Sequence, residues 1–146
     1  MKVPSVEWFQ ALAEQMAGPD AALHRKIGEM DLTCVWSFLD TPDGDQHYRL
    51  RFEEFDLVEI TPLAPDADVN DGADFVLEGD HLDWQVMVDN VVARGRPDRE
   101  HTLNYLSLPG TPLRCWSSDP LGRDMFFRFN QSLQVFVNAT ARLVTV

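Results

Sequence analysis

Hydrophobic and polar positions change their period once, in the middle of the chain, between residues 73 and 91. Residues 75–78 alternate as in a β-strand, whereas apolar residues from Trp84 onward recur at the spacing of a helix. Between the two, Gly79 allows the chain to turn, and the Asp80 carboxylate is placed to cap the first amides of the helix. The helical stripe consists of Trp84, Met87, Val88 and Val91. The pattern therefore predicts a strand, a tight turn and a helix.

The same patterns place the other elements along the chain. Alternation predicts strands at residues 32–39, 48–52, 57–61 and 113–117. Helical spacing and capping residues predict helices at residues 6–16, 20–26, 103–108 and 120–141. At 146 residues and 45% hydrophobic content, the chain has the size of one domain, which we expect to span residues 1–146. We expect this domain to be α+β.

A turn at residues 41–45 connects the first two predicted strands, since it contains proline, aspartate and glycine. After the turn, Tyr48, Leu50 and Phe52 alternate with three polar residues, His47, Arg49 and Arg51. The alternation predicts a hairpin with one apolar face and one face in water. We therefore expect His47 to be a surface histidine, although Asp45 could lie beside it on the same face.

The net charge of the chain argues against several classes of binding partner. The chain carries 24 acidic and 12 basic residues, and its net charge of -12 repels nucleic acid and anionic lipid surfaces. We find no apolar run of the length of a membrane span and no signal peptide, so we expect a cytoplasmic protein. Cys34 and Cys115 each lie in an apolar strand-like segment, where a reduced cysteine acts as a small core residue.

Candidate chemistry is sparse, and we expect no catalytic residue, no metal site and no cofactor. The four histidines are scattered, and no nucleophile or phosphate-binding motif is present. The acidic segment 66–72 departs from a calcium loop, because Leu77 stands where the bidentate glutamate is needed. Residues 94–99 form a basic cluster, which is either a solvated loop or a docking site for an anionic headgroup.

One stretch resembles a known family. The sequence Ala-Asp-Phe-Val-Leu-Glu-Gly-Asp at residues 73–80, followed by Asp83 and Trp84, is similar to the sterol carrier protein type 2 family of lipid-binding domains. The resemblance covers residues 45–92, and includes the strand-like segments 48–52 and 57–62. It implies an antiparallel β-sheet of about five strands covered by helices.

The resemblance also implies a function, which is the carriage of an apolar ligand such as a fatty acyl chain or a sterol in a cavity. Eight residues are candidates to line that cavity between sheet and helices: Trp36, Phe38, Trp84, Met87, Val88, Leu106, Phe126 and Phe129. Two alternatives stay open. One is a small isomerase or hydrolase with the cone-shaped nuclear-transport-factor-like (SnoaL-like) fold, and the other is an accessory subunit that binds a partner protein or a second copy of itself.

Overall fold

Five strands form one sheet in the order β3-β2-β1-β4-β5 in the computed structural model, which describes residues 2–108 and 110–143. The strands are β1 (Leu32–Thr41), β2 (Gly44–Glu53), β3 (Asp56–Leu63), β4 (Phe75–Asp80) and β5 (Arg114–Trp116). The helices are α1 (Val6–Ala17), α2 (Ala21–Ile27), α3 (His81–Arg94), α4 (Leu103–Leu106) and α5 (Pro120–Asn138). Two short 3-10 turns are also present, η1 (Arg99–His101) and η2 (Ala139–Arg142).

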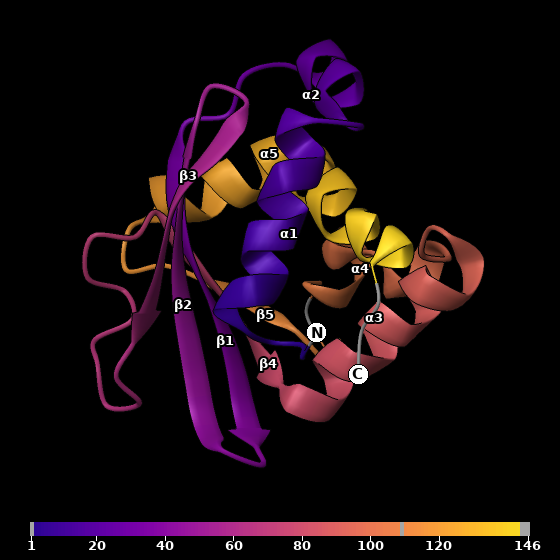
Figure 1. The fold of residues 1–146 in the computed structure, drawn as a ribbon. Helices are drawn as coiled ribbons and strands as arrows, with labels where there is room; N and C mark the ends of the chain where they lie inside the picture. The colour runs from indigo at the N-terminus through magenta and orange to yellow at the C-terminus, as the bar shows by residue number, and fades with distance from the viewer. Residues whose placement is uncertain (1, 109, 144–146) are drawn as a thin grey trace.

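The helices α1, α3 and α5 cover one face of the sheet, which we call the inner face (Figure 1). The sequence requires this arrangement, because every second residue from Leu32 to Phe38 on β1 and from Tyr48 to Phe52 on β2 is an apolar side chain that must leave water. The register aligns these side chains in rows, so that Trp36 lies between Tyr48 on β2 and Leu77 on β4. The α+β class and the apolar inner face are thus as predicted.

One pair of strands differs from the antiparallel sheet that the resemblance implies. The strands β1 and β4 are parallel, with Cys34 opposite Phe75 and Phe38 opposite Gly79, while the other three pairs are antiparallel. A parallel pair needs a connection that returns along the sheet. Residues 64–74 provide it by crossing the outer face from β3 to β4, where the Asp71 carbonyl accepts a hydrogen bond from Arg49.

The crossing connection buries part of the outer face, which changes the environment of His47. Its side chain is 8% exposed, and its Nδ1 lies 2.7 Å from the Ser37 hydroxyl oxygen. Val35 and Val76, on the same face, are also fully buried. The expectation of a surface histidine was therefore wrong, because alternation along β2 shows which face a residue is on but not whether a distant loop covers that face.

The transition from β4 to α3 confirms the change of period, with a different role for Gly79. The strand continues through Gly79 to Asp80, and the helix begins at the next residue, with the Asp80 carboxylate accepting a hydrogen bond from the Leu82 amide at 3.0 Å. A side chain on Gly79 would overlap Leu113 and approach Trp84. The glycine is thus needed for close packing of the α4–β5 loop against the sheet and not for a turn.

The C-terminal region is helical, as the spacing of its apolar residues predicts, since α5 and η2 cover residues 120–142. In the cone-shaped fold considered above, long curved strands come last, whereas here the last strand, β5, has three residues and α5 follows it. That alternative fold is therefore wrong for this chain. Within the described residues, no helix combines the length and apolar character that crossing a membrane requires.

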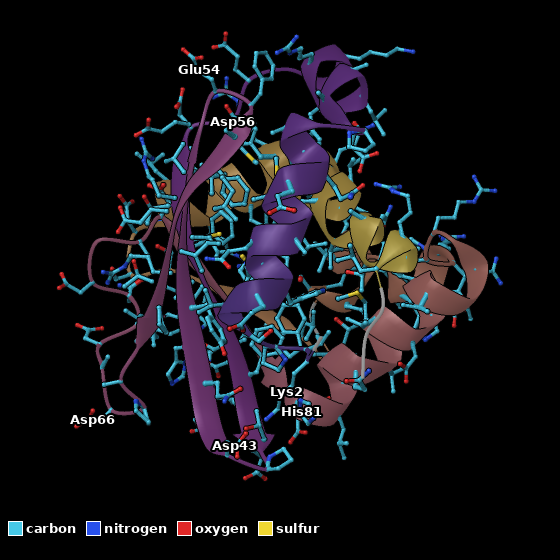
Figure 2. The ribbon with its side chains drawn as sticks, viewed as in Figure 1. Lys2, Asp43, Glu54, Asp56, Asp66 and His81 are labelled. Carbon is cyan, nitrogen blue, oxygen red and sulfur yellow. The ribbon has the colours of Figure 1, made fainter. Side chains whose placement is uncertain are left out.

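Charged side chains lie on the outside of the molecule (Figure 2). Glu54, Asp56 and Asp66 point away from the core, and Lys2 forms an ion pair with Asp43 near the tip of the β1–β2 hairpin. The hydrogen bond from Lys2 lowers the pKa of Asp43 below its usual value. These charged side chains thus lie away from the inner face, where apolar side chains pack.

We predict that Gly122→Ala destabilises the protein, although alanine is the better helix former. Gly122 is buried in the first turn of α5, where a Cβ would overlap the Asp74 carbonyl oxygen. Backbone cannot move aside as a flexible side chain can, so we expect a loss of about 1–3 kcal/mol in the free energy of unfolding, measured in urea. The control Gln131→Ala, at an exposed site of α5, should change it by no more than about 0.5 kcal/mol. Equal stability of the two variants would contradict the close packing.

Candidate functional site

The predicted ligand-binding residues gather between the inner face and the helices, with one exception. Seven of the eight are buried members of one apolar cluster: Trp36, Phe38, Trp84, Met87, Val88, Leu106 and Phe126. The eighth, Phe129, is half-buried, packs against the edge of that cluster and lines a separate surface pocket with Ile27 and Glu29. The structure thus brings the set together except at Phe129, whose place on α5 turns its side chain away from the cluster's centre.

Aromatic side chains fill the middle of this cluster. The rings of Trp36 and Trp84 stack at 5.2 Å between centroids, and Phe38 lies 4.6 Å from Trp84. Trp84 is further fixed by a hydrogen bond of 2.9 Å from its Nε1 to the Ser37 carbonyl oxygen. The Nε1 of Trp36 is buried, and the only acceptor near it among the described residues is the Cys34 sulfur, which accepts hydrogen bonds weakly. The aromatic centre of the cluster therefore contains a donor that protein atoms satisfy only weakly.

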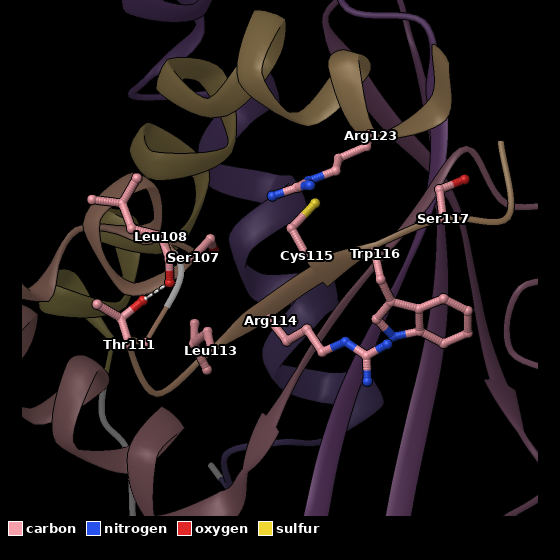
Figure 3. Close-up of a pocket in the computed structure, with 10 residues that line it drawn as sticks. Ser107, Leu108, Thr111, Leu113, Arg114, Cys115, Trp116, Ser117 and Arg123 are labelled. Carbon is pink, nitrogen blue, oxygen red and sulfur yellow. Dashed lines mark hydrogen bonds between the residues drawn. The ribbon is translucent and has the colours of Figure 1, made fainter. Parts of the chain in front are cut away.

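A pocket of about 500 Å³ opens at the edge of the sheet, between the α4–β5 loop, β5 and the first turns of α5 (Figure 3). We call it the edge pocket. Its wall combines apolar, hydroxyl and cationic side chains: Leu108, Leu113, Trp116, Ser107, Thr111, Ser117, Arg114 and Arg123, with Cys115 between them. Leu113 and Cys115 also belong to the buried apolar cluster. These two residues thus form the wall between the edge pocket and the apolar cluster.

Register connects the edge pocket to the aromatic interior. Cys115 on β5 lies opposite Leu77 on β4, and Leu77 lies opposite Trp36 on β1. These three side chains therefore form one row across the inner face, since residues paired in register share a face. The wall of the edge pocket at Cys115 is therefore two strands away from Trp36 along this row.

The edge pocket is positively charged within an acidic protein. Among the described residues that line it, Arg114 and Arg123 are cationic and none is a carboxylate. Four other surface pockets in the described part of the chain each contain at least one Asp or Glu. Figure 3 shows Arg123 reaching from α5 to Cys115, while Arg114 lies on the other side of β5, over the ring of Trp116. The two cations thus flank the edge strand.

Burial controls the chemistry of the two cysteines. It raises the pKa of the Cys115 thiol to about 12, although the nearby Arg123 acts in the opposite direction. Burial also raises the pKa of Cys34, which lies at the inner face. Both thiols therefore stay protonated near neutral pH, and the thiolate is the reactive form. Neither cysteine is placed to act as a nucleophile, and both pack as the sequence predicts.

Local hydrogen bonds hold the wall of the edge pocket in place. The Leu113 amide donates to the Leu106 carbonyl at 2.9 Å, and the Thr111 hydroxyl donates to the same carbonyl at 2.7 Å. The Leu103 amide donates to the Gln134 side chain at 2.7 Å, which ties α4 to α5. These contacts close the α4–β5 loop and fix the position of the residues that line the pocket.

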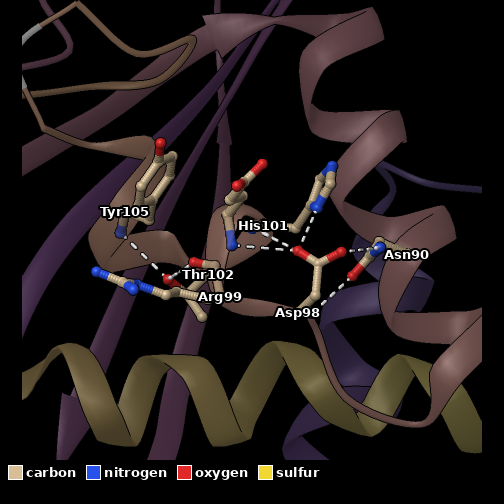
Figure 4. Close-up of polar contacts among 7 residues, drawn as sticks. Asn90, Asp98, Arg99, His101, Thr102 and Tyr105 are labelled. Atoms are coloured by element: carbon tan, nitrogen blue, oxygen red, sulfur yellow. Dashed lines mark hydrogen bonds and ion pairs between the residues drawn. The ribbon is translucent and has the colours of Figure 1, made fainter.

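The segment before α4 is anchored by the carboxylate of Asp98 (Figure 4). It accepts hydrogen bonds from the amides of Glu100 and His101, from the His101 ring at 2.6 Å and from the Asn90 side chain. The hydrogen bond from His101 lowers the pKa of Asp98. The segment 94–99, which contains the predicted basic cluster, thus serves here as the structured connection from α3 to α4.

The residues of the edge pocket were not among those predicted to bind ligand. Arg114 and Arg123 are separated in the sequence by acidic and apolar residues, and Ser107 follows a short helix without any motif. No local pattern could have identified them, because only the pairing of β5 with β4 and the docking of α5 bring them to one place. Within residues 2–108 and 110–143, no group of three or more His, Cys, Asp or Glu could hold a metal ion.

Comparison with solved structures identifies the fold. A conserved hypothetical protein from Thermus thermophilus, described as possibly a sterol carrier protein, matches 97% of this chain and 90% of its own, with a TM-score of 0.67 and 16% identity. Sterol carrier protein 2 matches 96% of this chain and 98% of its own, with a TM-score of 0.65 and 15% identity. No protein-family model and no curated protein matches the sequence. The chain has the sterol-carrier-protein-2 fold, which confirms the predicted resemblance and fold class.

We predict that neither thiol reacts readily in the folded protein at pH 8. The raised pKa of Cys115 leaves on the order of one thiolate in 10⁴ at that pH, whereas an unfolded cysteine near its ordinary pKa has far more. Alkylation by iodoacetamide, followed by intact mass spectrometry, should be slow in buffer and complete in guanidinium chloride. The Cys34→Ser variant assigns the remaining signal to Cys115. Rapid labelling of Cys115 in buffer would contradict its burial.

Proposed function

We propose that this protein binds and carries an apolar ligand, such as a fatty acyl chain, a sterol or a similar lipid, without catalysis. The ligand would lie between the inner face of the sheet and α1, α3 and α5, among the seven clustered residues named above. The observation that carries the proposal is that Leu113 and Cys115 belong both to the wall of the edge pocket and to the apolar cluster. A ligand in that pocket already touches the core.

The character of the interior supports an apolar ligand. The apolar cluster contains no charged side chain, and its centre is a set of aromatic rings in contact, with Trp36 stacked on Trp84. Burial of a methylene contributes about 0.8 kcal/mol, so about ten of them contribute roughly 8 kcal/mol before ordering costs. Micromolar affinity corresponds to about -8 kcal/mol, so most of a long chain would have to be buried.

The weakly satisfied Nε1 of Trp36 supports the same location. Its nearby acceptor is the Cys34 sulfur, and a hydroxyl or carbonyl oxygen on a ligand would be a stronger one. Met87, which packs in the same cluster, has a flexible side chain that can adapt to a new neighbour. The fold provides further support, because one of the two similar structures is named sterol carrier protein 2.

We predict that a brominated fatty acid, dibromostearate, quenches the tryptophan fluorescence of the protein saturably, while stearate does not. Bromine quenches only at short range, and three of the four tryptophans, Trp8, Trp36 and Trp84, are buried in the interior. The fourth, Trp116, lies opposite Val76 on the outer face. In the Trp116→Phe variant, quenching should therefore persist. Its disappearance in that variant would place the ligand outside the core.

We predict that Val88→Trp lowers the affinity for a fluorescent fatty acid, measured by titration. Val88 faces the apolar cluster from α3, so an indole there would occupy the space that the chain needs. Overpacking would also destabilise the fold by about 1–3 kcal/mol, which thermal unfolding reports separately. The matched control is Val86→Trp, two residues away on α3, where the side chain is 53% exposed.

Two results would contradict the proposed function. Equal affinities of Val88→Trp and Val86→Trp would show that the chain does not enter the interior. If the unmodified protein shows no saturable lipid binding at all, an accessory subunit that binds a partner protein becomes the better interpretation.

A further inference from the structure

The edge pocket stands out electrostatically from the rest of the molecule. The protein has a net charge of -12, yet the described lining of this pocket contains two arginines and no acid. Neither Arg114 nor Arg123 forms an ion pair with any carboxylate in the described part of the chain. Instead, Arg114 lies over Trp116 and Arg123 over Phe127. Arg123 is therefore available to a ligand of opposite charge, whereas Arg114 lies opposite Glu78 on β4.

A buried hydroxyl adds a second, independent indication of a ligand. Ser107 lines the edge pocket, its side chain is 4% exposed, and its Oγ has no hydrogen-bond partner among the described residues. Such an unpaired donor in a pocket wall is unusual, because buried polar atoms are nearly always satisfied. A ligand oxygen in the pocket would satisfy it.

Position decides which arginine would contact the ligand directly. Arg123 extends over the Cys115 side of β5, which is the side that continues to Leu77 and Trp36 (Figure 3). Arg114 follows the alternation of the strand to the opposite side. Arg123 can therefore present its two-pronged guanidinium in the edge pocket beside Cys115, while Arg114 attracts from the rim.

We infer that the edge pocket binds the anionic head of an amphipathic ligand, a carboxylate or a phosphate, held by Arg123 and Ser107 while its apolar chain extends past Cys115 and Leu77. This inference rests on the proposed function and specifies the class of ligand: an anionic lipid such as a fatty acid, in preference to a neutral sterol or alcohol. Leu108 and Leu113 would cover the first carbons of the chain.

The test compares three ligands with the same chain, dodecanoate, dodecyl phosphate and dodecanol, by calorimetric titration. The unmodified protein should bind both anions roughly tenfold or more tightly than dodecanol, since hydrogen bonds to a charged group are stronger than neutral ones. Arg123→Gln should weaken the binding of dodecanoate roughly tenfold to hundredfold and leave dodecanol unchanged. Arg123→Lys should restore part of the loss, because it keeps the charge but not the fork.

Matched variants separate local contact from net charge. Arg128→Gln changes the charge of the same helix by the same amount outside the edge pocket, and it should leave the affinity for dodecanoate unchanged. Ser107→Ala should weaken both anions a few-fold. Thermal unfolding of each variant checks that the fold is intact. The inference is overturned if Arg123→Gln and Arg128→Gln bind dodecanoate equally.

The outcomes also distinguish this inference from the proposed function. If dodecanol binds as tightly as dodecanoate, the carriage of apolar ligands stands and the anionic head site is wrong. Acetate and inorganic phosphate, titrated alone, test the head site without a chain. These small anions could bind in a manner that depends on Arg123, while dodecanoate, dodecyl phosphate and dodecanol bind no more tightly than they do. In that case the edge pocket is a site for free anions, and both the proposed function and the lipid ligand are wrong.

Discussion

The packing of Trp84 against Trp36 and Phe38 is the contact on which the rest of the structure depends. It joins α3 to the central strand of the sheet, at 5.2 Å and 4.6 Å between ring centroids. The hydrogen bond from Trp84 to the Ser37 carbonyl fixes the orientation of the ring. Because α3 follows β4 directly after Asp80, this contact also determines where β4 lies in the sheet. The edge pocket in turn depends on β4, since β5 pairs with it and Leu113 packs on Gly79.

Much of this fold could be predicted from the sequence, because local patterns determine it. Alternation along β1 and β2 identifies the inner face, and the change of period after Leu77 identifies the junction of β4 and α3. The parallel pairing of β1 with β4 could not be predicted, because alternation shows the faces of a strand but not its direction. The burial of His47 was missed for a related reason, since it depends on a connection from a distant part of the chain.

The residues of the candidate site also fall into two groups, those that could be predicted from the sequence and those that could not. Interior residues such as Trp36 and Val88 could be selected because they lie on apolar faces, which the sequence displays. Phe129 also has helical spacing, but a helix apolar around much of its circumference does not show which part faces the core. The edge pocket could not be foreseen, because Ser107 and Arg123 meet only after α4 and α5 have docked on the sheet. The basic segment 94–99, which the sequence offered as a docking site for an anionic headgroup, lies instead in the connection from α3 to α4.

The acidic surface and the cationic pocket act over different distances, and this difference bears on selectivity. At physiological ionic strength, charges separated by more than about 8 Å are largely screened, so the net charge of -12 hardly opposes a small anion that has already arrived. Within the pocket, Arg123 would act at hydrogen-bond distance, where screening is weak. Large anionic surfaces such as nucleic acid or an acidic bilayer would still meet many carboxylates at once. The charge distribution thus admits a single anionic head at one point and disfavours extended polyanions elsewhere.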